Sequence, residues 1–187
     1  MKVLVLHEHG SEITELIAPI DILKRAAIEV HILHKTCLDS PLANEGIVDK
    51  DVFPGDIKSP DDYDALIIPG GKRGVANLEP AWAWSEGRLT KLMKDMFKGG
   101  KLLAAICAAP SILGKNGLLV GKKYTCYPGW QDDSYYGIYT GEEVEVDGNL
   151  ITGKSMYYST DFGLKIVEYL LGKDKRIEIE RKVKGII

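Results

Sequence analysis

One cysteine lies at a junction where its side chain could do chemistry. Cys107 directly follows the apolar run 102–106, and the residues at 108–113 have the apolar spacing of a helix. Pro110 fits the first turn of such a helix, because the N–H that proline lacks would have no partner there. A side chain on this turn projects from the carboxyl edge of a sheet, where open α/β folds bind their ligands.

This position would favour nucleophilic chemistry at the sulfur of Cys107. The positive end of the following helix favours the thiolate. The free N–H groups after Cys107, beginning with that of Ala108, can bind an anion or a developing oxyanion. The alternative is that Cys107 is a small buried apolar side chain, as free cysteines often are, and its spacing in the sequence fits both interpretations.

A second turn predicts an N–H donor for the same site. The strand pattern 65–68 ends in Pro69, Gly70 and Gly71. Glycines let a backbone approach a ligand closely, so Gly70 and Gly71 are candidate binding residues. The N–H of Gly71 would complete an oxyanion site with that of Ala108. The alternative is an ordinary turn at the end of a strand.

Glu15 is the candidate acid–base partner of Cys107. It lies in the segment 10–23, between the first strand pattern and a helical pattern. Pro19 cannot donate a hydrogen bond to the carbonyl of Glu15, which predicts an irregular helix at that point. A protonated Glu15 that pointed at Cys107 would donate to the thiolate and stabilise it. The alternative is a solvated Glu in a first helical turn, where the helix dipole favours it.

The elements that must position these residues alternate between strand and helix patterns. Continuous apolar runs, typical of strands buried on both faces, occupy 3–6, 30–33, 65–68 and 102–106. Apolar residues with helical spacing occupy 13–23, 89–97 and 162–170. This alternation predicts an α/β three-layer sandwich, in which a mainly parallel sheet has helices on both faces.

Two C-terminal segments depart from that pattern. The alternating residues 143–146 and 150–152 flank Asp147-Gly148, which predicts an accessory antiparallel β-hairpin. The charged stretch 173–187 is either a helix packed on the domain or an edge element.

Length and composition narrow the class of protein. The 187 residues predict a single domain over 1–187, and the net charge of −3 without a basic stripe argues against nucleic-acid binding. No apolar run is long enough to cross a membrane, and the N-terminal segment lacks a signal-peptide pattern, so we expect a cytoplasmic protein. The three cysteines, Cys37, Cys107 and Cys126, have no paired spacing, which argues against disulfides and a structural zinc site.

The segments around these residues resemble the DJ-1/PfpI superfamily, in its DJ-1/ThiJ-like branch. Residues 104–110 are similar to its nucleophile motif, 67–71 to its oxyanion-side turn, and 10–21 to its Glu-bearing segment, with Glu15 at the matching position. The resemblance implies a flavodoxin-like fold, a homodimer and no cofactor. It also implies an oxidisable Cys107, and glyoxalase, deglycase, chaperone, peptidase or redox-sensing activity.

Departures from the family pattern rank these activities. Peptidases of the family have a His directly after the nucleophile, where this chain has Ala108, so peptidase activity ranks last. Tyr127, a candidate substrate-binding residue, stands where some members of the family have a His and many bacterial members have the same Tyr. The segment 154–158 replaces a Gly-Pro-Gly-Thr pattern with a bulkier one. The leading hypothesis is a glyoxalase or deglycase acting on a small carbonyl compound, or an oxidative-stress-responsive protein, that uses Cys107. The alternative is a non-catalytic chaperone-like or redox-sensing dimer.

The histidines and the remaining cysteines allow further interpretations. The four histidines, His7, His9, His31 and His34, lie in the first 34 residues, and none matches a catalytic His of the family. His7 and His9 fit a polar loop better than a metal site or a base. Cys126 is either a resolving thiol for Cys107 or a partly buried strand residue.

Overall fold

The structure is a computed structural model. It describes residues 1–34, 46–53, 55–84 and 87–186, except for the side chains of 79–84 and 88. The strands are β1 (Lys2–His7), β2 (Glu29–His34), β3 (Lys50–Val52), β4 (Ala65–Ile68), β5 (Leu102–Ile106), β6 (Lys123–Tyr124), β7 (Ile138–Tyr139), β8 (Val144–Asp147) and β9 (Leu150–Gly153). The helices are α1 (Ile13–Arg25), α2 (Lys72–Trp84), α3 (Arg88–Lys98), α4 (Pro110–Lys115), α5 (Ser159–Leu171) and α6 (Lys173–Val183), with short 3-10 turns at Pro60–Asp62, Asp133–Tyr135 and Met156–Tyr158.

A seven-stranded sheet forms the centre of the fold, in the order β3-β2-β1-β4-β5-β9-β8. Its strands run parallel except for β8, which is antiparallel to β9, so the predicted hairpin is confirmed as the edge of the sheet. The four predicted apolar strands lie at its centre as β1, β2, β4 and β5. Strands β6 and β7 form a separate two-stranded sheet that the sequence patterns did not predict.

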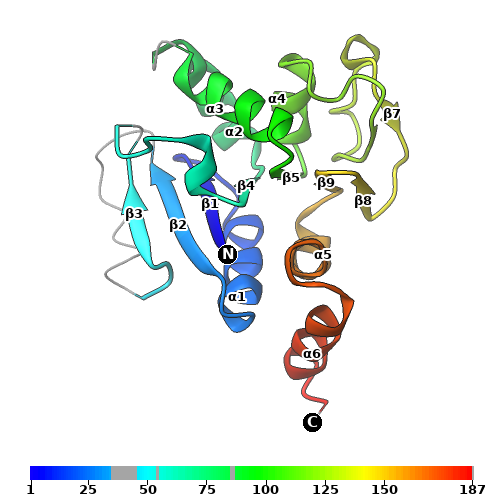
Figure 1. Cartoon of the computed structure of the whole chain (residues 1–187). Helices are drawn as coiled ribbons and strands as arrows, with labels where there is room; N and C mark the ends of the chain where they lie inside the picture. The colour runs from blue at the N-terminus through cyan, green and yellow to red at the C-terminus, as the bar shows by residue number, and fades with distance from the viewer. Residues whose placement is uncertain (35–45, 54, 85–86, 187) are drawn as a thin grey trace.

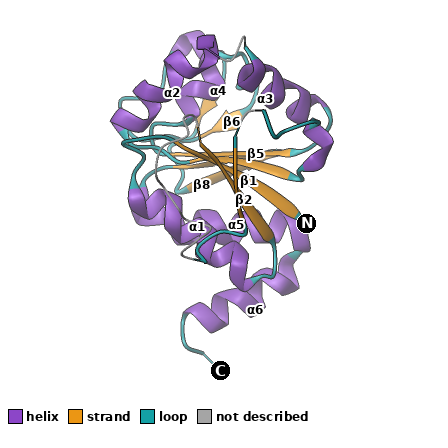
Figure 2. Cartoon of the chain, turned by 90° about the vertical axis from the view of Figure 1, so that its left-hand side faces the viewer, coloured by secondary structure: helices purple, strands orange, loops and turns teal. Residues whose placement is uncertain are grey.

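Helices cover both faces of the sheet, as the alternating patterns predicted (Figure 1). Helices α2, α3 and α4 lie on one side, and α1 and α5 lie on the other, with α6 beyond them toward the C-terminus (Figure 2). Leu4, Leu66 and Leu103 point to the first side, and Val3, Ile67 and Ala104 to the second, all of them 0–1% exposed. This alternation along each strand gives the sheet two apolar faces and explains why its central strands are continuous apolar runs.

The charged C-terminal stretch is a helix rather than an edge strand. Helix α6 carries ion pairs between residues one turn apart, such as Lys182 with Glu178. It reaches the core through Ile179, which is 0% exposed and packs in the cluster beneath α1 and α5. No helix in the described parts of the chain has the length and apolar character needed to cross a membrane.

The order of the strands fixes where a ligand would bind. From β1 the chain proceeds to β2 and β3 on one side, and β4, β5 and β9 follow on the other. The switch in direction therefore falls between the neighbouring strands β1 and β4, and the crevice at the carboxyl ends of such a pair is the usual ligand site of open α/β sheets. Helix α1 begins just after β1, and Cys107 follows β5, one strand away from β4.

Candidate active site

Cys107 occupies a sharp turn at the carboxyl end of β5. Its φ is +63°, a left-handed conformation that a side chain with a Cβ rarely adopts and that costs about 1–3 kcal/mol. Two backbone hydrogen bonds hold it there: its N–H donates to the carbonyl of Gly153 at 2.8 Å, and its carbonyl accepts from the N–H of Tyr127 at 2.8 Å. The strained turn keeps the half-buried thiol at the edge of the sheet.

Glu15 points at Cys107 from helix α1 and is only 1% exposed. Its side chain shares a hydrogen bond with the thiol of Cys107. Its Oε2 also accepts from the N–H of Gly70 at 2.9 Å. The carboxyl group is thus held between two segments of the site, and the interpretation of Glu15 as a solvated surface residue is wrong.

The start of α1 supports this orientation of Glu15. The carboxylate of Glu12 accepts the N–H of Glu15 at 2.7 Å and so caps the helix. The helix then continues through Pro19, so the irregularity that was predicted at Glu15 does not interrupt it. The sequence did not identify Glu12 because glutamate is not among the preferred N-cap residues.

Gly70 and Gly71 are required by the close approach of three segments. A Cβ on Gly70 would lie 2.6 Å from Oε2 of Glu15 and 2.7 Å from the carbonyl oxygen of Ile106. Gly71 has a φ of +91°, and a Cβ there would lie 2.6 Å from the backbone N of Glu12. The turn after β4 therefore lies directly against both the start of α1 and the turn at Cys107.

Replacing Gly70 by Ala is expected to destabilise the fold and displace Glu15. The new methyl group meets a backbone carbonyl that cannot move freely, so we expect a loss of about 2–3 kcal/mol in the free energy of unfolding, measured by urea denaturation. Gly55→Ala is the matched control, because an added Cβ there meets nothing within 4 Å. Equal stabilities of the two variants would show that the turn at Gly70 accommodates a Cβ without strain.

Two backbone N–H groups bond to the sulfur of Cys107 itself. They belong to Gly71 and Ala108, the two residues that the sequence predicted as an oxyanion site. Both hydrogen bonds lower the pKa of the thiol, which is the effect expected of donors beside a developing thiolate. The structure thus brings Gly71, Ala108 and Glu15 together around one atom.

The protonation states of Cys107 and Glu15 depend on each other. Burial raises the pKa of Glu15 to about 7. Burial also raises the pKa of Cys107 to about 12, and the charge of Glu15 beside it acts in the same direction. Desolvation and the carboxylate outweigh the two N–H donors, so the pKa of the Cys107 thiol lies above its ordinary value. At neutral pH the pair holds a thiol next to a carboxyl group that can accept its proton.

Glu15→Gln is expected to remove a pH dependence of stability. The folded-state pKa of Glu15 is about 7 against an ordinary value of 4.5, so this group contributes stability at acidic pH that is lost as the pH rises through 7. By this linkage the wild-type protein loses about 3 kcal/mol between pH 4.5 and pH 8 from Glu15 alone.

Denaturant unfolding at both pH values measures this change. The Gln variant should show a flatter dependence, and Glu142→Gln, at an exposed position, should match the wild type. If Glu15→Gln had the slope of the wild type, Glu15 would have an ordinary pKa.

The remaining residues that the sequence suggested for the site differ in how far they are buried. The backbone of Tyr127 touches Cys107, and its side chain is 49% exposed at the same edge. Cys126 is 0% exposed, and burial raises the pKa of its thiol to about 11, which argues against a resolving role. Cys37 lies outside the described residues. Gly153, the acceptor for the N–H of Cys107, gave no signal in the sequence.

Three of the four histidines, His7, His31 and His34, have side-chain partners on the other side of the switch point from Cys107. His31 lies within hydrogen-bond distance of Tyr63 and Glu29, and His7 within hydrogen-bond distance of His34. Within the described ranges, no group of three or more His, Cys, Asp or Glu side chains is arranged to hold a metal ion. The sulfur of Cys107 instead has Glu15, Gly71 and Ala108 as hydrogen-bond partners.

Comparisons with known proteins agree with this architecture. The chain is 32% identical over 188 residues to protein dj-1beta of Drosophila melanogaster, covering 98% of this chain and 95% of that protein. It is 34% identical over 156 residues to a deglycase of Pyrococcus horikoshii, covering 82% of this chain and 90% of that one. The solved structure of oxidised Toxoplasma gondii DJ-1 superimposes with a TM-score of 0.80 at 29% identity, covering 97% of each chain. The model of the DJ-1/PfpI family matches residues 1–169, and this chain belongs to that family.

Proposed function

We propose that this protein is a cofactor-independent enzyme that converts small α-oxoaldehydes to 2-hydroxy acids, with Cys107 as nucleophile and Glu15 as proton carrier. The observation that carries the proposal is the hydrogen bond between the Cys107 thiol and a buried Glu15 whose pKa is about 7. A general base is most effective when its pKa lies near the working pH. Glu15 meets that condition without a histidine.

The reaction can be written with each proton accounted for. As the sulfur of Cys107 attacks the aldehyde carbon, Glu15 takes the thiol proton and passes it to the aldehyde oxygen, which gives a hemithioacetal. Glu15 then takes the proton of the former aldehyde carbon to give an enediolate. The hydroxyl proton on that carbon passes to the oxygen of the neighbouring carbonyl, and Glu15 returns its proton to the neighbouring carbon, which leaves a thioester to Cys107. Water hydrolyses the thioester, releasing the 2-hydroxy acid and restoring the thiol. The net change is the addition of one water molecule, with no external oxidant or reductant.

The site offers donors for each charged stage. The N–H groups of Gly71 and Ala108 bond to the sulfur and offset negative charge as its proton leaves. The N–H of Gly70 holds Oε2 of Glu15, which fixes the carboxyl group beside the Cys107 turn. The similarity to a protein named a deglycase supports the extension to carbonyl adducts of amines, in which the same steps would release the amine.

The test is incubation of the protein with methylglyoxal in a buffer without thiols, following the loss of the dicarbonyl. Turnover that depends on Cys107 supports the proposal. Equal inertness of the wild type and Cys107→Ser would exclude this substrate.

Oxidation sensing is a second candidate function of the same thiol. The similar Toxoplasma gondii structure is described as oxidised, and Cys107 is half-buried rather than sealed. Oxidation requires the thiolate, however, and the raised pKa of Cys107 would slow it. Mass spectrometry after mild peroxide tests this function, and a product without two added oxygen atoms on Cys107 would count against it.

We further propose that the protein works as a homodimer in the cytoplasm. Family membership supports the dimer. The described thiols, Cys107 and Cys126, are free, as is usual in a reducing compartment. Light scattering coupled to gel filtration tests the dimer, and a mass near the 20.6 kDa of one chain would contradict it.

A further inference from the structure

Three side chains on neighbouring strands form a hydrogen-bonded chain outside the Cys107 site. Nε2 of His34 lies 2.7 Å from Oδ1 of Asp51 on β3, and Nδ1 of His34 lies 3.3 Å from Nδ1 of His7 on β1. The register of the sheet pairs His7 with His34 directly. His34 is 5% exposed, and the ring of Phe53 packs beside it with centroids 6.1 Å apart. Neither histidine has a role in the proposed reaction.

The distances dictate where the protons lie. A carboxylate only accepts hydrogen bonds, so Nε2 of His34 carries a hydrogen and donates it to Asp51. In neutral His34 the other nitrogen, Nδ1, is therefore an acceptor, and among the described residues Nδ1 of His7 lies within reach to donate to it. In neutral His7 the remaining nitrogen, Nε2, is then the basic one.

The hydrogen-bonded chain of His7, His34 and Asp51 can take up one proton without losing a hydrogen bond, but not two. A first proton adds to Nε2 of His7 and leaves both hydrogen bonds intact, because the proton between the two Nδ1 atoms can then pass to His34, which places the positive charge beside Asp51. With a second proton both rings are fully protonated, so that two N–H groups face each other across 3.3 Å and the His7–His34 bond is lost.

The surroundings of His7 set how readily it charges. Burial and the neighbouring His34 lower the pKa of His7, as does His9, whereas Glu8 and Asp51 raise it. The lowered pKa means that the neutral form is favoured in the fold, so stability is full above the ordinary value of 6.5 and declines as the pH falls below it.

The loop after His7 links the hydrogen-bonded side chains to the start of α1. The carbonyl of His9 accepts from the side chain of Asn77 at 2.8 Å, and the carbonyl of Gly10 accepts from the N–H of Gly74 at 3.0 Å. Glu12, at the end of the loop, donates its N–H to Gly70 and caps the helix that carries Glu15. A change at His7 is therefore five residues from Glu12, the cap that orients Glu15.

We propose that His7, His34 and Asp51 form an acid-sensing element, which binds one proton without rearrangement and a second by breaking the His7–His34 bond and loosening the loop 8–12. Its effect on activity rests on the proposed function, because Glu15 belongs to that site. Its proton binding and the loosening of the loop do not.

Nuclear magnetic resonance titration of the histidine rings in ¹⁵N-labelled protein tests the proton binding. We expect the coupled pair to take up its two protons in two steps, with the second step at lower pH, and the signals of both rings to respond to each step. Asp51→Asn should move the first step to lower pH because a balancing negative charge is gone. His34→Gln, which keeps hydrogen-bonding groups but cannot be protonated, should leave His7 with one step, moved to higher pH.

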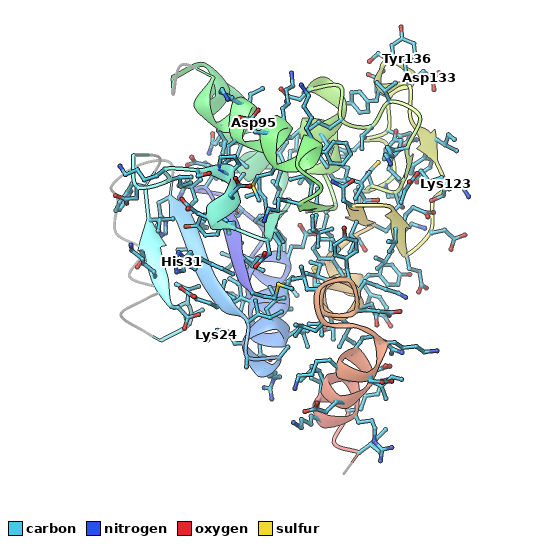
Figure 3. The ribbon with its side chains drawn as sticks, viewed as in Figure 1. Lys24, His31, Asp95, Lys123, Asp133 and Tyr136 are labelled. Atoms are coloured by element: carbon cyan, nitrogen blue, oxygen red, sulfur yellow. The ribbon has the colours of Figure 1, made fainter. Side chains whose placement is uncertain are left out.

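His31→Gln is the matched control, since His31 lies on the same strand as His34 (Figure 3) but bonds to Tyr63 and Glu29. It should leave the His7 titration unchanged. Independent single-step titrations of His7 and His34, unaffected by substitution of the other or of Asp51, would overturn the proposal.

Hydrogen exchange of the amides at 8–12 tests the loosening of the loop. Compared at the same pH, below the second step, the wild type should exchange faster than His34→Gln in this loop. Equal exchange in the two proteins would show that the proton site does not reach the loop. This readout does not depend on whether Cys107 is catalytic.

Discussion

Cys107→Ser is expected to reduce the consumption of methylglyoxal by about 1,000-fold or more, because a serine hydroxyl is a far weaker nucleophile than a thiol whose proton a neighbouring base can remove. The substitution replaces one atom and keeps the backbone hydrogen bonds to Gly153 and Tyr127, so the fold should be preserved. Loss of the dicarbonyl, followed by absorbance or chromatography, measures the effect.

Cys126→Ala is the matched control for that experiment. Cys126 is the other described free cysteine, but it is 0% exposed and packs in the core beneath α4. We expect its activity to stay within about twofold of the wild type once stability is accounted for. If Cys126→Ala lost activity and Cys107→Ser kept it, the wrong thiol would have been assigned.

Glu15→Gln is expected to separate the reactivity of Cys107 from turnover. The charge of Glu15 and its hydrogen bond both raise the pKa of the thiol, and a neutral amide removes the charge and can donate to the thiolate. Alkylation of Cys107 by iodoacetamide at pH 8.5 should therefore become about tenfold faster, since one pKa unit changes the thiolate fraction tenfold. Turnover should be lost nonetheless, because an amide cannot carry the proton between the two carbons.

The two readouts must move in opposite directions for this account to hold. A variant with slower alkylation and slower turnover would mean that Glu15 stabilises the thiolate, which is the role inferred from the sequence alone. A variant with unchanged turnover would remove Glu15 from the chemistry. Intact mass spectrometry in the Cys126→Ala background assigns the alkylation to the proper residue.

Patterns along the chain were sufficient to predict the central strands of the sheet. The apolar runs at β1, β2, β4 and β5 are buried on both faces, which is the physical origin of their composition, and Asp147-Gly148 connects β8 and β9 as expected. The edge strand β3 has three residues with one fully buried, so it offered no pattern to detect.

The members of the site were predictable, but their electrostatics were not. Cys107, Glu15 and Gly71 follow strand ends that neighbour one another in a parallel sheet, so their meeting follows from topology. The direction of the thiol pKa depends on how deeply packing buries Cys107 and Glu15, which no local spacing reports. The bond between His7 and His34 joins residues 27 positions apart, and only the register of β1 and β2 brings them together.

The pH dependence of kcat/KM for methylglyoxal tests the central claim, that Glu15 accepts the proton of Cys107 during attack. Because the pKa of Glu15 is about 7, the account predicts a rate that rises with pH, passes its midpoint near 7 and then levels off. A rate that is flat through pH 7 and rises only in the alkaline range of an unaided thiol would contradict it.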